Sequence, residues 1–269
     1  MLKQFQQRFN LLLGSIPVLT TLTFTASPSI AATFASSSAD AFINNFSHAP
    51  GSVGTLTDGD VFTVSTENGS VVANADFDAF FAQIEPFAFN SSFAQVEGSG
   101  IEYVGKAYSE ATVIGYNFFI PAGQTFSFDF LSSLDLETSI ERPPGEVAIA
   151  EANISFLLFD EATDSLLDYF IVSGQLETAE TNDFFFAKAS DNFHFLLDDS
   201  LQHFGGNQEF IIAEYLGEFS RPFSEDTYLT LVEVKNTYAM VKAPEPSSFI
   251  ALFVFGGVTG VALKKRKQS

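Results

Sequence analysis

The sequence contains no cysteine and no tryptophan among its 269 residues. The lack of cysteine excludes disulfide bonds, thiolate metal sites and a cysteine nucleophile. A folded chain of this composition must therefore take its stability from its hydrophobic core, or from bound ions. The lack of tryptophan removes the largest flat side chain on which a sugar ring could stack, so that only Tyr and Phe remain for such a role.

Basic residues are also scarce, with 12 Lys and Arg against 33 Asp and Glu. Six of the basic residues lie near the two ends, namely Lys3, Arg8 and the four residues of 264–267, whereas all the acidic residues lie between these ends. The surface of the central part therefore repels nucleic acid and anionic lipid. We expect no nucleic-acid partner.

Hydrophobic residues, in contrast, are plentiful. They make up 46% of the chain, and Phe alone occurs 33 times. Such a composition is not that of a disordered protein. The roughly 210 residues between the ends are enough for one domain with a sizeable core.

The N-terminal segment 1–31 has the order of parts of a secretory signal peptide. It has a positively charged start, a mostly apolar stretch over 11–24, and small residues at Ser29 and Ala31. This pattern predicts cleavage after Ala31 or Ala32. The alternative is an uncleaved membrane anchor, which the prolines and threonines of the region disfavour.

The C-terminal segment 243–269 combines a Pro-Glu-Pro motif, an uncharged apolar run over 249–263 and a basic cluster. As a helix, the apolar run would span about 22 Å, which is less than the roughly 30 Å of a bilayer core. Basic residues stay on the cytoplasmic side of a membrane, so the central part would lie outside. The residues that form this signal are Pro244, Glu245, Pro246, Lys264, Lys265, Arg266 and Lys267.

This order of parts resembles the PEP-CTERM sorting domain of Gram-negative bacteria, although only over about a tenth of the chain. The resemblance implies that an exosortase-type membrane protease cuts near Pro244-Glu245-Pro246, after the Sec machinery has exported the chain. The segment would then be a transient inner-membrane anchor for a protein of the cell envelope or extracellular matrix, linked to exopolysaccharide and biofilm. A permanent anchor, with Gly256 and Gly260 as a helix-dimerisation face, is the alternative.

The central part, 32–242, is predicted to be a single all-β domain. In the stretch QTFSFDF, Phe126, Phe128 and Phe130 alternate with polar residues and would share one face of a strand. Similar stretches are separated by turn sequences rich in Gly, Pro, Asn and Asp. Roughly nine or ten such strands favour an antiparallel β-sandwich or a jelly-roll-like fold.

Three segments of the central part have more specific expectations. Asn68-Gly69 lies between two Val-rich runs and predicts a hairpin closed by a type I′ turn. The segment 75–89 is expected to be a short helix that ends before Pro86, or a loop anchored by Phe side chains. The segment 35–42, ASSSADAF, is expected to be a polar lead-in to the domain.

The sequence offers little evidence of catalytic chemistry. It lacks a zinc-binding histidine motif, a nucleophile elbow and a phosphate-binding loop. His194 lies between two Phe residues in a strand pattern, and we expect it on the polar face. Carboxylates lie close together at Asp58 and Asp60, Asp76 and Asp78, Asp160, Glu161 and Asp164, and Asp198 and Asp199.

Such carboxylate pairs are inevitable in so acidic a chain, so we expect no catalytic residue, no metal site and no cofactor. Calcium is the minority hypothesis, because it binds carboxylates in loops, and Asp58 and Asp60 flank a glycine. Adjacent residues of Phe184-Phe185-Phe186 cannot all face inward from a strand, so some Phe side chains are expected on the surface.

The sequence therefore favours a non-enzymatic, exported protein with a structural or adhesive role linked to exopolysaccharide. A carbohydrate-binding module is the first alternative. An enzyme that acts on polysaccharide is the second.

Overall fold

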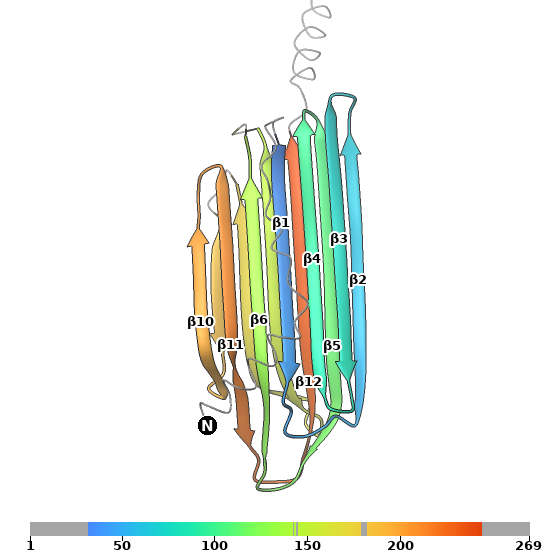
Figure 1. The fold of residues 1–269 in the computed structure, drawn as a ribbon, viewed down its shortest axis with the longest axis vertical. Helices are drawn as coiled ribbons and strands as arrows, with labels where there is room; N and C mark the ends of the chain where they lie inside the picture. The colour runs from blue at the N-terminus through green and yellow to red at the C-terminus, as the bar shows by residue number, and fades with distance from the viewer. Residues whose placement is uncertain (1–31, 142, 144, 179–181, 244–269) are drawn as a thin grey trace, which may run out of the picture.

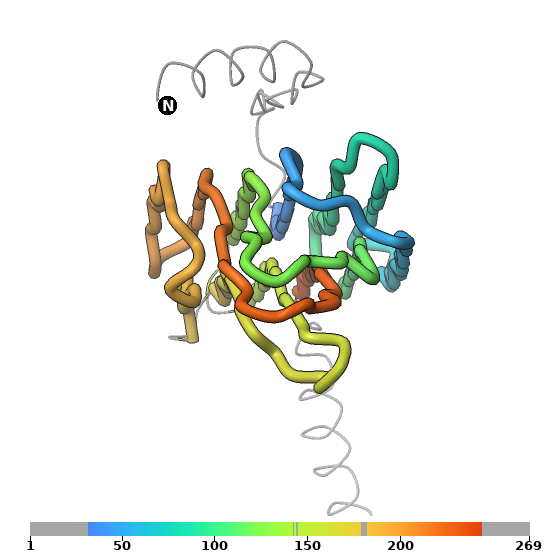
Figure 2. Tube along the Cα trace, turned by 90° about the horizontal axis from the view of Figure 1, so that it is seen from below, coloured from blue at the N-terminus to red at the C-terminus, as the bar shows by residue number. Residues whose placement is uncertain are grey.

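The computed structural model describes residues 32–141, 143, 145–178 and 182–243, which form two antiparallel sheets. The strands run along the long axis of the molecule (Figure 1), and a view from below shows two layers (Figure 2). Among these residues there is no helix that could span a membrane. The strands are β1 (Ala32–Asn44), β2 (Ser52–Ser65), β3 (Gly69–Ala82), β4 (Phe87–Gly100), β5 (Tyr103–Ile120), β6 (Thr125–Ser139), β7 (Val147–Asp160), β8 (Ser165–Glu177), β9 (Phe184–Ala189), β10 (Phe193–His203), β11 (Gln208–Pro222) and β12 (Thr227–Ala243).

Each layer is a six-stranded sheet. Sheet A has the strand order β10-β11-β6-β1-β4-β3, and sheet B has the order β2-β5-β12-β7-β8-β9. All neighbouring strands pair in the antiparallel sense. The described residues thus form the expected β-sandwich, with twelve strands instead of nine or ten.

The predicted hairpin at Asn68-Gly69 is wrong. The two strands that it joins lie in different sheets, because β2 pairs with β5 and β3 pairs with β4. Neither Asn68 nor Gly69 has a positive φ, and the turn is held instead by the Gly69 N–H, which donates to the Thr66 carbonyl oxygen at 3.1 Å. Two Val-rich strands around Asn-Gly need not pair with each other when each pairs along its whole length with another strand of its own sheet.

Two segments form strands that the sequence did not predict. The segment 35–42 lies within β1, a central strand of sheet A, where Ala35, Ala39 and Ala41 are buried. Alternation of Ala with Ser and Asp gives little contrast in hydropathy between the two faces, so the sequence pattern does not distinguish this strand from a polar lead-in. The segment 75–89 belongs to β3 and β4 with a turn between them, instead of a helix or a loop.

The side chains between the sheets form two hydrophobic clusters. One is rich in Phe and includes Phe126, Phe128 and Phe130 on the inner face of β6, as predicted. The rings of Phe128 and Phe219 stack with their centroids 5.0 Å apart. The other cluster consists mainly of Ala and Val, with Tyr103 as its largest buried side chain.

A layer of buried polar side chains separates these clusters where β1, β4, β5 and β12 face one another. On each of these strands, polar residues lie between residues of the Phe-rich cluster and residues of the Ala-rich cluster. We call this set the polar layer. It comprises Ser37, Asn90, Ser92, Ser109, Glu233, Lys235 and Thr237.

The start of β1 and the end of β12 lie at the same end of the sandwich. Ser37 Oγ of β1 donates to the Tyr238 carbonyl oxygen of β12 at 3.1 Å. Thr33 accepts a hydrogen bond of 2.7 Å from the Tyr103 hydroxyl, and Tyr103 is paired with Ala243. The first and last residues of the described sandwich, Ala32 and Ala243, therefore lie at the same end of its long axis.

Candidate functional site

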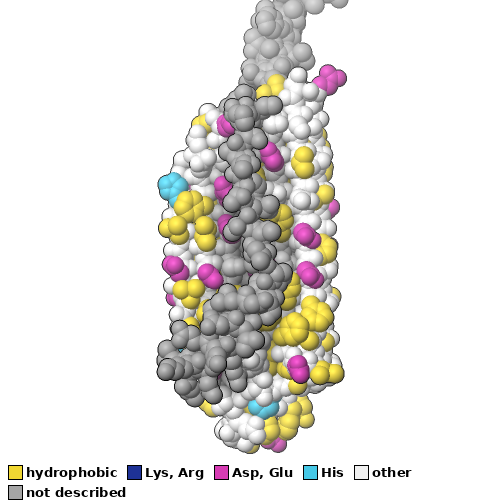
Figure 3. Space-filling model, viewed as in Figure 1, with side chains coloured by type: hydrophobic (Ala, Val, Ile, Leu, Met, Phe, Trp, Pro, Cys, Tyr) yellow, Lys and Arg dark blue, Asp and Glu magenta, His cyan; other side chains and the backbone are white. Residues whose placement is uncertain are grey.

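The two outer faces differ in charge. Arg221 is the one Lys or Arg in the described strands of sheet A. The space-filling view of the side formed by sheet A shows scattered acidic and hydrophobic side chains (Figure 3). In sheet B, Lys106, Lys188 and Lys242 are exposed. Sheet B therefore offers the more mixed surface for a ligand.

The outer face of sheet B carries a shallow depression of about 480 Å³. Strands β5, β12, β7, β8 and β9 all contribute to it, so its floor is a continuous piece of sheet. The residues that line it are Tyr108, Glu151, Ala152, Asn153, Ser173, Gly174, Gln175, Phe184, Asn236, Thr237 and Tyr238.

The register of the strands arranges these side chains in two rows across the sheet. In the first row, successive strands place Tyr108, Tyr238, Glu151, Gln175 and Phe184 directly opposite one another. Four spacings between adjacent strands give this row a length of about 19 Å. We call it the tyrosine row.

The second row lies beside the tyrosine row and carries mainly amide and hydroxyl groups. It consists of Glu110, Asn236, Asn153, Ser173 and Phe186, again directly opposite one another. We call it the amide row. Together the two rows place aromatic rings, hydrogen-bond donors and hydrogen-bond acceptors on one rigid surface.

Hydrogen bonds fix several of these groups. The Tyr108 hydroxyl donates to Glu110 and lies 3.5 Å from Asn236 Oδ1. Asn153 Oδ1 accepts a hydrogen bond of 2.9 Å from Ser155 Oγ, which orients its amide group. These contacts hold the side chains in place before a ligand arrives, which lowers the entropic cost of binding.

The environment raises the pKa of both tyrosine hydroxyls further above physiological pH. Burial, the hydrogen bond to Glu110, and the charges of Glu110 and Asp58 raise the pKa of Tyr108 to about 12. Burial and the charge of Glu151 also raise the pKa of Tyr238. Both hydroxyl groups therefore stay neutral at physiological pH and can donate or accept hydrogen bonds.

The two rows end in aromatic rings on the edge strand β9. Phe184 and Phe186 are 39% and 45% exposed, and their rings stack with centroids 6.0 Å apart. Phe185 points the other way and packs against the core. The expected division of this triplet between core and surface is thus confirmed.

The depression does not bring together the groups that glycoside hydrolysis requires. Glu151 is the one carboxylate among the described residues that line it, and Glu110 of the amide row lies outside the depression on β5, two strands away from Glu151. Such hydrolysis generally uses two carboxyl groups that flank the scissile bond. The depression has the groups of a binding surface.

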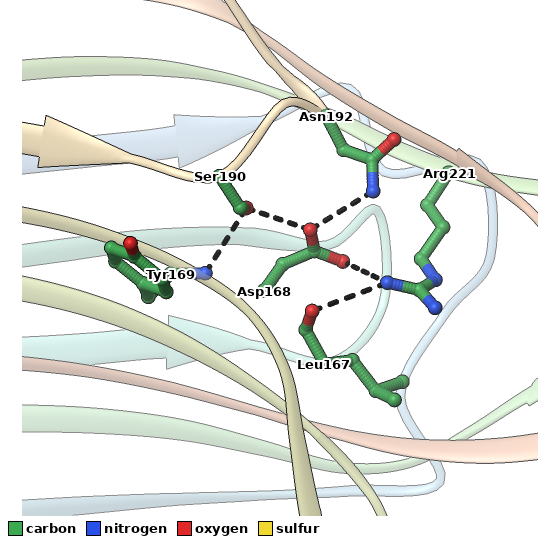
Figure 4. A network of polar contacts seen from close by, with 6 residues as sticks. All are labelled: Leu167, Asp168, Tyr169, Ser190, Asn192 and Arg221. Carbon is green, nitrogen blue, oxygen red and sulfur yellow. Dashed lines mark hydrogen bonds and ion pairs between the residues drawn. The ribbon is translucent and has the colours of Figure 1, made fainter.

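A second polar cluster has a structural role at one edge of the sandwich (Figure 4). The Asp168 side chain is 2% exposed. Its Oδ1 accepts hydrogen bonds from Ser190 Oγ at 2.7 Å and Asn192 Nδ2 at 2.9 Å, and its Oδ2 lies 2.7 Å from Arg221 Nη1. The carboxylate is fully engaged in joining β8 of sheet B to β11 of sheet A.

Carboxylates from three of the clusters noted in the sequence accept hydrogen bonds from nearby backbone and side-chain groups. No group of three or more potential metal ligands occurs in the part of the chain that the structure describes. Asp58 and Asp60 accept hydrogen bonds of 2.9 Å from the N–H groups of Gly59 and Val61, and Asp76 does the same for Phe77. They cap backbone groups of the outermost strands β2 and β3.

The other predicted residues lie as follows. Asp160 accepts hydrogen bonds from the N–H groups of two residues in the turn after β7, and Glu161 accepts from Asn117 N–H and Thr230. His194 is exposed, as predicted. The sorting signal and Ala31 lie outside the described residues, and Ala32 is the first residue of β1.

Comparison with known proteins finds no matching family model, and no curated protein or solved structure that matches the chain. The candidate site therefore stands on its own geometry.

Proposed function

We propose that this chain is an exported, non-enzymatic protein of the cell envelope or extracellular matrix, which holds a polysaccharide on the outer face of sheet B. The observation that carries the proposal is the pair of adjacent rows, one of tyrosines and one of amides, on a rigid sheet. Sugars bind through stacking of their apolar faces on aromatic rings and through hydrogen bonds of their hydroxyl groups. Both kinds of contact are available in the two rows.

The shape of the site favours a polymer over a small molecule. The depression is open, and the tyrosine row extends across five strands over about 19 Å. A small ligand is normally enclosed in a pocket that buries most of its surface. An open row can instead contact several successive units of a chain.

The charge of the site favours a neutral or amino-containing polysaccharide. Glu151 and Glu110 lie in the rows, and Asp58 lies close enough to act on Tyr108. An anionic polymer would bring its charges towards these carboxylates and towards a chain with a net charge of −21.

The export part of the proposal is supported by the sequence. The segment 1–31 would direct the chain to the Sec machinery, and 243–269 would anchor it in the inner membrane until an exosortase-type protease releases it. A link to exopolysaccharide and biofilm fits such sorting, and it also fits a binding surface for polysaccharide. Intact mass of the protein from fractionated cells tests this part, because a species that still ends at Ser269 would contradict release.

Binding to polysaccharide is tested by affinity electrophoresis and co-sedimentation with a panel of neutral, amino-containing and anionic polymers. We expect retention by at least one neutral or amino-containing polymer, and a loss of about tenfold or more with Tyr238→Ala, since one well-buried contact is worth about 1–2 kcal/mol. Tyr228→Ala is the matched control. Tyr228 lies on the same strand and is 50% exposed, but it packs on Phe119, outside the depression.

Failure of all neutral and amino-containing polymers to bind would overturn the proposal. Equal loss of binding with Tyr228→Ala and Tyr238→Ala would place the binding surface elsewhere.

A further inference from the structure

Three side chains of the polar layer meet inside the core: Asn90 of β4, and Glu233 and Lys235 of β12. One carboxylate oxygen of Glu233 accepts a hydrogen bond from Lys235 Nζ. The other accepts a hydrogen bond of 2.5 Å from Asn90 Nδ2. The amine of Lys235 and the amide of Asn90 therefore contact the two oxygens of one carboxyl group.

These contacts cross from one sheet to the other. Asn90 belongs to sheet A, but its Nδ2 also donates to the Ala111 carbonyl oxygen of sheet B at 2.9 Å. Ala111 is the residue directly opposite Lys235 in that sheet. The Asn90 side chain thus reaches the backbone beside Lys235.

The surroundings of the three groups exclude water. Asn90 and Lys235 are 0% exposed and Glu233 is 1% exposed. Burial lowers the pKa of the Lys235 ammonium group, while the charges of Glu233 and Asp40 and the hydrogen bond to Glu233 act in the opposite direction. A buried lysine of this kind loses its proton more readily, and the neutral amine is the nucleophilic form.

The arrangement is costly if it remains unreacted. A charged pair in the core loses its hydration, and its mutual attraction often fails to compensate. Asn90 Oδ1 in addition has no hydrogen-bond partner among the described residues, although it is fully buried. Such an unsatisfied polar atom is also unfavourable.

We propose that Lys235 and Asn90 form an intramolecular amide bond, with Glu233 as the group that transfers protons. Glu233 takes a proton from the Lys235 ammonium group, and the neutral Nζ attacks Cγ of Asn90. The new bond is Nζ–Cγ, and the bond that breaks is Cγ–Nδ2. Two protons leave Nζ: one remains on Glu233, which becomes neutral, and the other departs with Nδ2 as ammonia, so the step needs no oxidant, metal or cofactor.

The product is a covalent link between the two sheets. It would close a loop from β4 to β12 in a chain that has no cysteine and hence no disulfide. A link across a long loop restricts the unfolded chain most. It would also remove the buried charged pair and convert the primary amide of Asn90 into part of the bond.

The first measurement is the intact mass of the purified full-length chain, followed by chymotryptic peptide mapping. We expect a mass lower by one ammonia, about 17 Da, and one branched peptide that joins the segments around Asn90 and Lys235. Asn68-Gly69 could also lose ammonia by forming a succinimide, but chymotrypsin separates Asn68 from Asn90 at the Phe residues between them. The peptide map therefore distinguishes the two reactions.

Variants then test each role. Lys235→Met should restore the full mass and remove the branched peptide, whereas Lys242→Met, which changes an exposed lysine on the same strand, should leave both as in the wild type. Glu233→Gln should slow or abolish the reaction.

Two results would overturn the proposal. The first is a wild-type chain of unmodified mass whose Asn90 and Lys235 peptides are recovered separately, and this result does not depend on the folding of any variant. The second is a branched peptide that forms to the same extent with Glu233→Gln, which would contradict the role of Glu233.

Discussion

Replacement of Asp168 by alanine is expected to destabilise one edge of the sandwich. At this edge, β8 meets both the turn that precedes β10 and the last residues of β11. The buried carboxylate accepts hydrogen bonds from Ser190, Asn192 and Arg221 (Figure 4). Removal of one partner of a buried ion pair costs about 3–5 kcal/mol. The Arg221 side chain is 30% exposed, so water can solvate it after the change. We therefore expect the lower end of this range, about 3 kcal/mol.

Urea unfolding followed by far-ultraviolet circular dichroism measures this loss, since the chain has no tryptophan to report on its core by fluorescence. Asp168→Asn keeps the shape and one acceptor oxygen but loses the charge, and it should cost about 1–2 kcal/mol. Asp191→Ala is the matched control. It removes an exposed carboxylate between Ser190 and Asn192, and its effect should stay within about 0.5 kcal/mol.

A loss of less than about 1 kcal/mol for Asp168→Ala would contradict the role assigned to this cluster. The same conclusion would follow if Asp168→Ala and Asp191→Ala had equal effects.

Two further predictions concern pH and self-association. Burial and the charge of Asp198 raise the pKa of Tyr215 from 10.0 to about 12. The folded state therefore holds this proton more tightly than the unfolded state, so the stability it contributes is complete below pH 10 and is lost as the pH rises towards 12. Tyr215→Phe should reduce the fall in the free energy of unfolding over this pH range. An unchanged slope of the free energy of unfolding against pH would contradict the role assigned to Tyr215. The double variant with Asp58→Asn and Asp60→Asn removes charge from β2, the edge strand of sheet B, and should increase self-association in sedimentation velocity. Asp164→Asn removes one charge from an exposed turn and should leave self-association unchanged.

The sequence predicted best those strands whose two faces differ strongly in hydropathy. Strand β6 alternates Phe with Ser and Asp, and its Phe side chains are buried as expected. Strand β1 alternates between small residues, and its place at the centre of sheet A depends on small side chains that fit close against the facing sheet. Periodicity contains no information about such a requirement.

The candidate site was harder to predict, because it depends on register between strands that are far apart in the chain. Tyr108 and Tyr238 lie opposite each other only because β5 pairs with β12. The sequence indicates the buried pair in the core only weakly. Glu233 and Lys235 lie on the same face of β12 as Leu229 and Leu231 in its alternating pattern. The opposite face of that strand also carries Val and Tyr residues, so hydropathy alone did not decide which face points inward.

The two ends of the described sandwich determine how it would stand on a membrane. β1 begins and β12 ends at one end of the sandwich, and the 18 residues of β5 correspond to about 60 Å of strand. Until its release, a sandwich tethered at that end would project from the membrane with its long axis perpendicular to it, and the tyrosine row would lie on the outer face of sheet B. Because the row runs across the strands, a polysaccharide bound along it would lie parallel to the membrane. Neighbouring molecules could then bind the same polymer at the same distance from the membrane.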